Sequence, residues 1–348
     1  MTFAAIILAA TATFPTLTQL HTGAPTLNPS PGVTSFTFVV AGDNRPAKTG
    51  DPLTQPVQDI IIALEKTPPA LIVWNGDTIS GKDASKAPGQ YSQFILAFAG
   101  LSAPLFNAPG NHELVHDITC GTQSAEYPYQ DVLTAYENAM SAPYGMFRYG
   151  NAAFVIVNTD DMPDLLVPGR CIYNGYVSKK QLHQLKATLA ALETDATVTH
   201  TFLFMHRPIH DPGNSHQIGN GKKDTSAYNK QVEAFRRAID HGGYKKLLFV
   251  FSSHDHLFDV YPKGAKLSGT SPGTGGEPTF VITGGAGAPL SGCTNPKKSG
   301  GPGSYYHYLS VAVAGANVTV TPVALYGTTP CTPPPAATLT PATGTTGR

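Results

Sequence analysis

Apolar and polar positions follow two different rhythms along the chain. Between residues 34 and 254, continuous apolar runs typical of strands covered on both faces alternate with segments whose apolar residues recur at helical spacing. The runs that predict strands lie within residues 35–43, 70–77, 103–113, 149–160 (a hairpin-like pair), 200–208 and 244–254. The segments that predict helices are 53–66, 90–100, 178–193 (with Ser178 as N-cap) and 228–240.

The last third of the chain changes to a period of two, which is typical of strands. Its predicted strands are 256–261, 279–284, 305–315 and 317–325. The two rhythms together predict an α/β fold of mixed α+β character, with a mostly β part at its end. Stretches rich in Gly, Pro, Asp and Ser interrupt the pattern at 80–90, 114–130, 161–177, 210–227 and 263–277. Loops of this length commonly form functional rims.

Composition narrows the range of partners. Only 13% of the 348 residues are charged, and 23 Lys and Arg residues balance 23 Asp and Glu residues. Because there is no basic excess, we expect no nucleic-acid partner held by bulk charge. The same balance leaves room for a small charged substrate held at one site.

The two ends of the chain differ from its middle. The apolar run at the start is too short to span a bilayer, and "Ala10-Thr11-Ala12" would serve as a small-residue cleavage site. We expect an export signal within residues 1–20 and a secreted or periplasmic location; a weakly apolar terminus without signal function is the alternative. The tail at 327–348 is rich in Pro, Thr and Gly, so we expect it not to pack.

The four cysteines fit none of the closely paired spacings of zinc sites. An even number in an exported chain favours two disulfides. Three pairings are open; we favour Cys120–Cys171 with Cys293–Cys331, because each bond would then tie one excursion from the core. Four unpaired thiols are the alternative for a chain that stays in the cytosol.

Five of the predicted strands end in unusual polar residues. These are Asp43 and Arg45, Asp77, Asn111 and His112, His206, and His254 and His256. Ligands of open α/β sheets bind in the crevice at the carboxyl ends of the strands. Two carboxylates, one amide oxygen and three imidazoles there suit a transition metal such as Fe, Zn, Mn or Co, and they suit Ca²⁺ poorly. Each cluster alone has an ordinary explanation, such as an Asp in a turn, but five in order do not.

The ordered set "GD", "GD", "GNHE", "H" and "HxH" resembles the motifs of the calcineurin-like metallophosphoesterases, which include the purple acid phosphatases. The resemblance runs from about Ser35 to about Leu325. It implies two mixed β-sheets packed as a sandwich flanked by helices, in a four-layer αββα arrangement. Residues 33–326 would be the metallophosphoesterase catalytic domain.

The resemblance also implies a dinuclear metal site. Its ligands would be Asp77 as the bridge, Asn111, His206 and His254 on one ion, and Asp43 and His256 on the other. His112 would protonate the leaving oxygen or stabilise its developing charge. Glu113 would orient His112 rather than bind metal.

Two positions depart from the family pattern. Arg45 stands where the common motif Asp-x-His has a metal ligand, and an arginine stays protonated and cannot ligate. Ser80 stands where purple acid phosphatases have their tyrosine. One ion therefore loses a protein ligand, and would be weaker, more hydrated or bound only together with substrate. We expect Arg45 to bind the substrate phosphate as a forked donor, with a structural ion pair as the alternative.

We therefore expect a metal-dependent hydrolase of phosphoric esters, of the phosphomonoesterase or acid phosphatase type, that acts on a small phosphorylated substrate. Of the histidines in the 210–227 loop, His210 is expected to touch substrate and His216 to be solvent-exposed. A phosphodiesterase acting on nucleotides or lipid head groups is one alternative. A secreted binding protein with weakened catalysis is the other, and Arg45 and Ser80 are the features that favour it.

Overall fold

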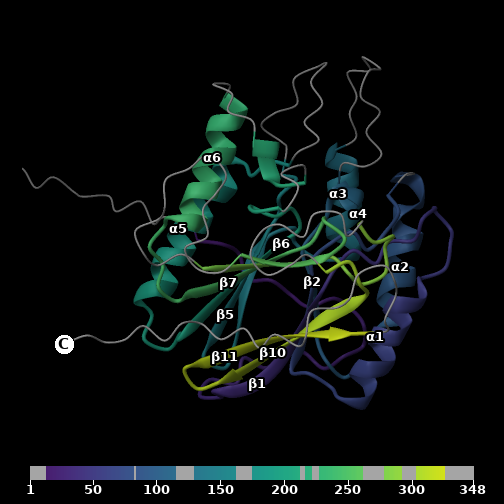
Figure 1. Ribbon diagram of the computed structural model, residues 1–348, viewed down its shortest axis with the longest axis horizontal. Coiled ribbons are helices and arrows are strands. Elements are labelled where there is room, and N and C mark those ends of the chain that lie inside the picture. Colours follow the sequence, from purple (N-terminus) through teal and green to yellow (C-terminus); the bar gives the residue numbers. More distant parts are fainter. Residues whose placement is uncertain are drawn as a thin grey trace, which may run out of the picture.

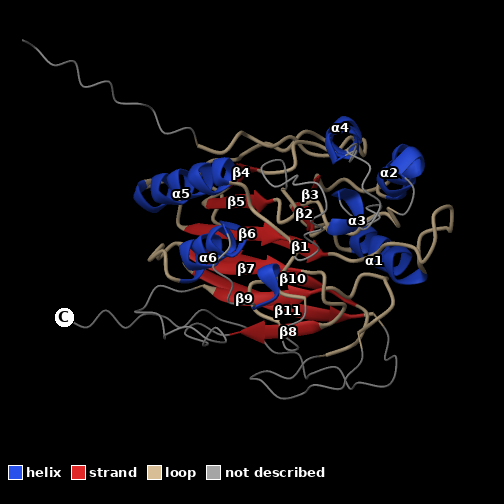
Figure 2. Ribbon diagram, turned by 90° about the horizontal axis from the view of Figure 1, so that it is seen from above, coloured by secondary structure: helices blue, strands red, loops and turns tan. Residues whose placement is uncertain are grey.

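Two β-sheets pack face to face between two groups of helices. The computed structural model describes residues 13–81, 84–114, 129–161, 175–211, 216–221, 227–261, 278–291 and 303–325. Figure 1 shows helices α5 and α6 on one side of the sheets and α1 and α2 on the other. The view from above in Figure 2 shows the same four layers. The predicted fold class is confirmed.

The first sheet has five strands, of which β1, β2 and β3 run parallel, while β10 is antiparallel to both β1 and β11. In spatial order its strands are β11 (Asn317–Ala324), β10 (His307–Ala314), β1 (Ser35–Ala41), β2 (Leu71–Trp74) and β3 (Leu105–Asn107). The helices on its side are α1 (Gln55–Lys66), η1 (Ala84–Lys86), α2 (Ala87–Ala97), α3 (Asn111–Leu114) and α4 (Tyr129–Ala139).

The second sheet has six strands, with β5, β6, β7 and β9 parallel and β4 and β8 antiparallel at the edges. In spatial order they are β4 (Gly145–Tyr149), β5 (Ala152–Val157), β6 (His200–Met205), β7 (Leu247–Ser252), β9 (Thr279–Thr283) and β8 (Phe258–Tyr261). The helical segments on its side are α5 (Lys179–Thr194), η2 (Ile218–Gly221) and α6 (Ala227–Asp240). The predicted cap of α5 is confirmed, because Ser178 Oγ accepts from Gln181 N at 3.2 Å.

Phenylalanines fill the space between the sheets. Phe38 of the first sheet packs against Phe154 and Phe202 of the second, with ring centroids 5.1 and 4.9 Å apart. Successive strand residues face opposite ways, so Phe38 joins this inner core while Val39 faces the helices. One face of each central strand is covered by the other sheet and the opposite face is covered by helices. Because both faces are buried, the sequences of these strands are continuously apolar.

The structure departs from the predicted elements in several places. The strand pair predicted at 149–160 begins earlier, because β4 starts at Gly145. Helix α4 begins at the end of the predicted loop 114–130, and it buries Tyr129, Val132 and Tyr136 at helical spacing. The N-terminal segment also packs earlier than expected, since Phe14, Leu17 and Leu20 are buried. Backbone bonds tie this segment to the edge strands of both sheets, from Leu17 N to Met146 O (2.8 Å) and from Leu20 N to Leu105 O (2.7 Å).

The folded part therefore begins before the predicted boundary at residue 33. Removal of residues 1–20 would take away three buried side chains, whereas a cut after Ala12 would spare them all. Residues 1–12, all four cysteines and the 327–348 tail lie outside the described residues, so the export signal, the disulfides and the unpacked tail stay predictions. Among the described helices, none is long and apolar enough to cross a membrane.

Candidate metal centre

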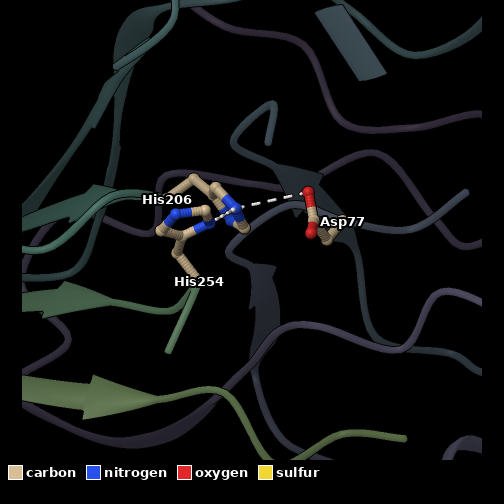
Figure 3. A group of neighbouring side chains, drawn as sticks. All are labelled: Asp77, His206 and His254. Carbon is tan, nitrogen blue, oxygen red and sulfur yellow. Dashed lines mark hydrogen bonds and ion pairs between the residues drawn. The ribbon is translucent and has the colours of Figure 1, made fainter. Parts of the chain in front are cut away.

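The predicted polar strand ends meet at one place, where the two sheets face each other. The first sheet contributes the residues that follow β1, β2 and β3, and the second contributes those that follow β6 and β7. Figure 3 shows Asp77 approaching His206 and His254 from the opposite side, with a dashed line from the carboxylate to His206. Oxygen ligands thus come from one sheet and imidazoles from the other.

The four-residue group consists of Asp77, Asn111, His206 and His254. Its centre is His206 Nε2, which lies 3.2 Å from Asp77 Oδ1, 3.0 Å from Asn111 Oδ1 and 3.1 Å from His254 Nδ1. The ligand atoms of Asp77, His206 and His254 all lie within 4.8 Å of one another. A single ion could therefore contact all of them after small side-chain adjustments.

The three-residue group consists of Asp43, Asp77 and His256, whose ligand atoms also lie within 4.8 Å of one another. His256 Nε2 is 3.7 Å from Asp43 Oδ1, too far for a hydrogen bond. Asp43 Oδ1 is buried and has no hydrogen-bond partner. A buried carboxylate oxygen left without a donor is costly, and a cation in this gap would satisfy it.

Backbone strain marks the same residues. Asp43, Asp77 and His254 have positive φ angles of 61°, 52° and 69°, and they are three of the four non-glycine residues with positive φ among the described residues. Each such residue costs about 1–2 kcal/mol. Strain of this kind persists where the surrounding structure demands it, most often at functional sites.

Glycine is required at Gly76, directly before Asp77. Its φ is +80°, and a Cβ there would lie 2.5 Å from Gly110 N and 2.9 Å from His206 Nδ1. Any side chain would push apart the turns that carry Asp77 and Asn111. This close approach explains the "NGD" and "GNHE" turns in physical terms.

Backbone carbonyls orient two of the imidazoles. His206 Nδ1 lies 2.8 Å from Asn75 O, and His256 Nδ1 lies 2.5 Å from Pro289 O. A carbonyl only accepts, so each Nδ1 carries the proton and each Nε2 presents a lone pair to the site. Metal-ligating histidines are commonly held in this way.

The charge states also suit a metal. Burial lowers the pKa of His254 and of His256, which favours the neutral form of both rings. Burial and the neighbouring Asp77 raise the pKa of Asp43 well above its usual value. Burial alone would raise the pKa of Asp77 too, but His112, His206 and Arg45 outweigh it and hold that pKa low. Two buried carboxylates with neutral imidazoles form a mixed O/N set that fits a divalent transition metal.

His112 and Glu113 have separate tasks. His112 Nδ1 lies 2.6 Å from Ser80 O, and its Nε2 lies 3.7 Å from Asp77 Oδ2, so the ring edge faces the site. The expectation that Glu113 orients His112 is wrong, because no bond joins Glu113 to that ring. Glu113 instead accepts from the backbone of Asp77, Thr78, Ile79 and Gly110 at 2.6–3.3 Å. It joins the turn after β2 to the turn after β3.

Arg45 lies beside the three-residue group. Its Nε is 3.6 Å from Asp77 Oδ2, and its side chain is 19% exposed. The ion pair that the sequence offered as the alternative is therefore present, and its partner is the shared carboxylate itself. The side chain of Arg45 is thus more exposed than that of Asp77, which is 2% exposed.

The expectation that His210 touches substrate is wrong. His210 is buried, and it stacks against Tyr261 and Phe280 with ring centroids 5.0 and 4.5 Å away. Its nearest carboxylate is Asp240, 3.7 Å from its Nε2. The chain turns inward after Pro208, so nearness in sequence to the ligand His206 does not place His210 at the site.

His216 takes the place expected of His210. Its ring centroid lies 5.5 Å from that of His254, and its Nδ1 is 3.1 Å from Asp255 Oδ1. The hydrogen bond to Asp255 raises the pKa of His216. The side chain is 45% exposed, as expected, but it stands at the rim of the site rather than away from it. A further group that could hold a metal ion lies here. One potential ligand atom from each of His216, Asp255 and Asp211 lies within 4.8 Å of the other two.

Sequence reasoning missed Arg207 and Asp160. Arg207 Nη1 donates to His254 Nε2 at 2.9 Å, and its Nε contacts both carboxylate oxygens of Asp160 at 2.9 and 3.1 Å. Because Arg207 can only donate, His254 Nε2 accepts, and the proton of the neutral ring is on Nδ1, next to His206 Nε2. Binding of an ion at Nδ1 would displace this proton. Asp160 stands at the end of β5, so the strand-end rule that identified the other residues could have found it as well.

Comparisons with known proteins agree with this geometry. A family model described as calcineurin-like phosphoesterase matches residues 36–258. No curated protein sequence matches the chain. A purple acid phosphatase, PPD1 from yellow lupin (Lupinus luteus), has a similar structure: TM-score 0.59, 15% identity, 86% of this chain and 53% of that chain covered.

Two more solved structures are similar. A dimetal phosphatase from Danio rerio has a TM-score of 0.53 at 13% identity, with 88% of this chain and 98% of that chain covered. PhoD has a TM-score of 0.57 at 15% identity, with 90% and 70% covered. At such identities the likeness shows the fold alone. The chain spans about half the length of the lupin enzyme that it matches.

Proposed function

The chain belongs to the calcineurin-like phosphoesterase family, and from this premise we propose that it is a phosphomonoesterase with two metal ions at the site described above. Membership makes it a metal-dependent hydrolase of phosphoric esters, a class whose substrates here are small phosphorylated molecules. The dinuclear centre, the preference for monoesters and the choice of Fe, Zn, Mn or Co are the parts that we propose.

The position of Asp77 carries the proposal. Its Oδ1 faces the four-residue group through His206, and its Oδ2 faces the opposite side, toward His112 and Arg45. The three-residue group includes the same carboxylate. One carboxylate between two groups of ligands is the arrangement that a bridged pair of ions needs.

The residues present fit the metals that the family uses. Asp43 Oδ1 is a buried acceptor without a donor, and the imidazoles of His206 and His256 present lone pairs to the site. When bound, the ions would activate water and offset the negative charge of the phosphoryl group.

The side chains around the metal ligands then have distinct roles. The guanidinium of Arg45 binds phosphoryl oxygens as a forked cationic donor. His112, held at Nδ1 by the Ser80 carbonyl, presents Nε2 toward the leaving group. His216, paired with Asp255 at the rim, is a second candidate donor of a proton to the leaving oxygen.

Hydrolysis of two synthetic esters tests the proposal. The purified protein with Mn²⁺ or Zn²⁺ is assayed on p-nitrophenyl phosphate and on bis(p-nitrophenyl) phosphate. We expect at least about tenfold higher kcat/KM on the monoester, and loss of that activity in His112→Ala. Faster hydrolysis of the diester would make the chain a phosphodiesterase. Absence of metal-dependent hydrolysis of both esters would contradict the proposal and favour a binding protein.

Export and disulfides extend the proposal beyond the site. We propose that residues up to Ala12 act as an export signal and that Cys120–Cys171 and Cys293–Cys331 are bonded. N-terminal sequencing of the secreted protein should begin at Thr13, and mass spectrometry without reduction should find the two linked peptides. A mature chain that retains residues 1–12, or four free thiols, would contradict this part.

A further inference from the structure

The charge beside the three-residue group is positive before any metal binds. The guanidinium of Arg45 lies 3.6 Å, measured at Nε, from Asp77 Oδ2. Its Nε is buried and has no hydrogen-bond partner. The positive charge of Arg45 therefore already interacts with Asp77, a carboxylate that a metal ion in the three-residue group would also need.

The four-residue group also has an arginine nearby, Arg207, but the charge of Arg207 is balanced by an ion pair with Asp160. Arg207 contacts both carboxylate oxygens of Asp160, at 2.9 and 3.1 Å, and touches the group only through the outer nitrogen of His254. Within the described residues, Arg45 has no carboxylate in ion-pair contact except Asp77, which belongs to the group itself. The two positions thus differ in ligand number and in uncompensated charge.

We propose that Arg45 makes the three-residue position a phosphate-dependent metal site. One ion binds the four-residue group without help. The second ion binds tightly only when the phosphoryl group of a substrate or product stands between it and Arg45. The anion then replaces the missing ligand and offsets the repulsion from the guanidinium. This inference rests on the proposed function, because it assumes that phosphate esters bind here.

The exposure of Arg45 supports a role in phosphate binding rather than only a structural ion pair with Asp77. The side chain of Arg45 is 19% exposed, whereas that of Asp77 is 2% exposed, so an incoming anion reaches the arginine before the carboxylate. Linkage then requires reciprocity: if phosphate strengthens binding of the second ion, the second ion strengthens binding of phosphate by the same factor.

Titration of the metal-stripped protein with Mn²⁺ tests the coupling. Calorimetry counts the ions and measures both affinities, with and without inorganic phosphate, and electron paramagnetic resonance separates isolated Mn²⁺ from a spin-coupled pair. Without phosphate we expect one tight ion and a second at least about tenfold weaker. With phosphate we expect the second affinity to rise at least about tenfold, within the range typical of coupled sites, and the paired signal to appear.

Three variants assign the effect to Arg45. Arg45→Gln removes the charge, so the second ion should bind about tenfold more tightly without phosphate, and the phosphate effect should shrink by the same factor. Arg45→His adds a ligand, so two ions should bind with similar affinity in the absence of phosphate. Arg148→Gln removes an exposed arginine paired with Asp195 and should leave both ions unchanged.

The outcomes separate this inference from the proposed function. Two equally tight ions in the wild-type protein without phosphate, or a phosphate effect that survives intact in Arg45→Gln, would overturn the role of Arg45. If two ions bind without phosphate and the monoester is hydrolysed, the proposed function stands without the inference. If binding is phosphate-dependent but neither ester is hydrolysed, the inference stands and the proposed function fails.

Discussion

The two sheets contribute to the site in different ways. The first sheet supplies the candidate oxygen ligands from the turns after β1, β2 and β3, and these are Asp43, Asp77 and Asn111. The second sheet supplies the candidate nitrogen ligands after β6 and β7, which are His206, His254 and His256. Neither sheet alone holds a complete set, so metal binding should join the two halves of the sandwich. The fold and the chemistry are thus coupled through the same six side chains.

The largest effect is expected from removing the carboxylate that both groups share. Asp77→Asn leaves the turn its hydrogen-bonding oxygen but removes the charge between the two proposed ion positions. We expect kcat for p-nitrophenyl phosphate to fall at least about a thousandfold, because each ion supplies several kcal/mol of charge stabilisation. Asp59→Asn, on the outer helix α1, should keep full activity. A loss of less than about tenfold in Asp77→Asn would contradict a bridging role.

Metal removal tests whether the two sheets are joined at the site. An ion present at 100 times its Kd should stabilise the folded state by about 2.7 kcal/mol, or roughly 5–10 °C in Tm for a chain of this size. Asn111→Ala on the first sheet and His254→Ala on the second should each abolish this shift, as measured by thermal unfolding with and without Mn²⁺. His183→Gln, exposed on α5, is the matched control. A shift that survives either ligand change would mean that the ion binds one sheet only.

Arg207 allows a smaller test on the second sheet. Arg207→Lys keeps the charge but loses the fork that holds both Asp160 and His254. We expect Mn²⁺ affinity to fall about tenfold, the lower end of the range for residues that orient metal ligands. Asp160→Asn should have a similar effect. If both variants bind Mn²⁺ normally and only their Tm falls, the pair is structural and does not position His254.

Much of this arrangement follows from sequence, because strand ends obey a simple rule. Apolar runs such as the one that ends before Asp77 predict buried strands, and polar residues after parallel strands lie on one edge. The rule predicted that the six candidate ligands and Arg45 would lie near one another, and the structure brings them together. Helix α4 could also have been predicted from the sequence, because the apolar residues Tyr129, Val132 and Tyr136 are spaced as on one face of a helix.

Other features depend on tertiary contacts that local patterns do not encode. His210 and His216 belong to one loop, and only the path of the chain after Pro208 decides which faces the site. Glu113 stands next to His112 in sequence, yet its partners are backbone groups of the neighbouring turn. The segment from Phe14 to Leu20 is an extended strap over the sandwich edge, without the periodicity of a helix or a strand.

His307, which is not one of the candidate ligands, offers the smallest test. It is buried on β10 with Nδ1 2.8 Å from Tyr305 O, and burial lowers its pKa to about 4. The unfolded chain therefore takes up the proton first as pH falls, so stability is lost between about pH 6.5 and about pH 4. From pH 6 to pH 5 we expect the free energy of unfolding in urea to fall about 1 kcal/mol more in the wild-type protein than in His307→Asn. Equal losses would show that His307 is not the group involved.

The most direct measurement follows hydrolysis and metal content in the same samples. Metal-stripped protein is supplied with increasing Mn²⁺, bound Mn²⁺ is counted per chain, and the initial rate on p-nitrophenyl phosphate is recorded for the wild-type protein and Asp77→Asn. The rate should rise with bound Mn²⁺ in the wild type, reach its maximum at two ions per chain in the presence of substrate, and stay near background in Asp77→Asn. A wild-type rate that is already maximal without bound metal, or that is matched by Asp77→Asn, would contradict a metal centre shared between the two sheets.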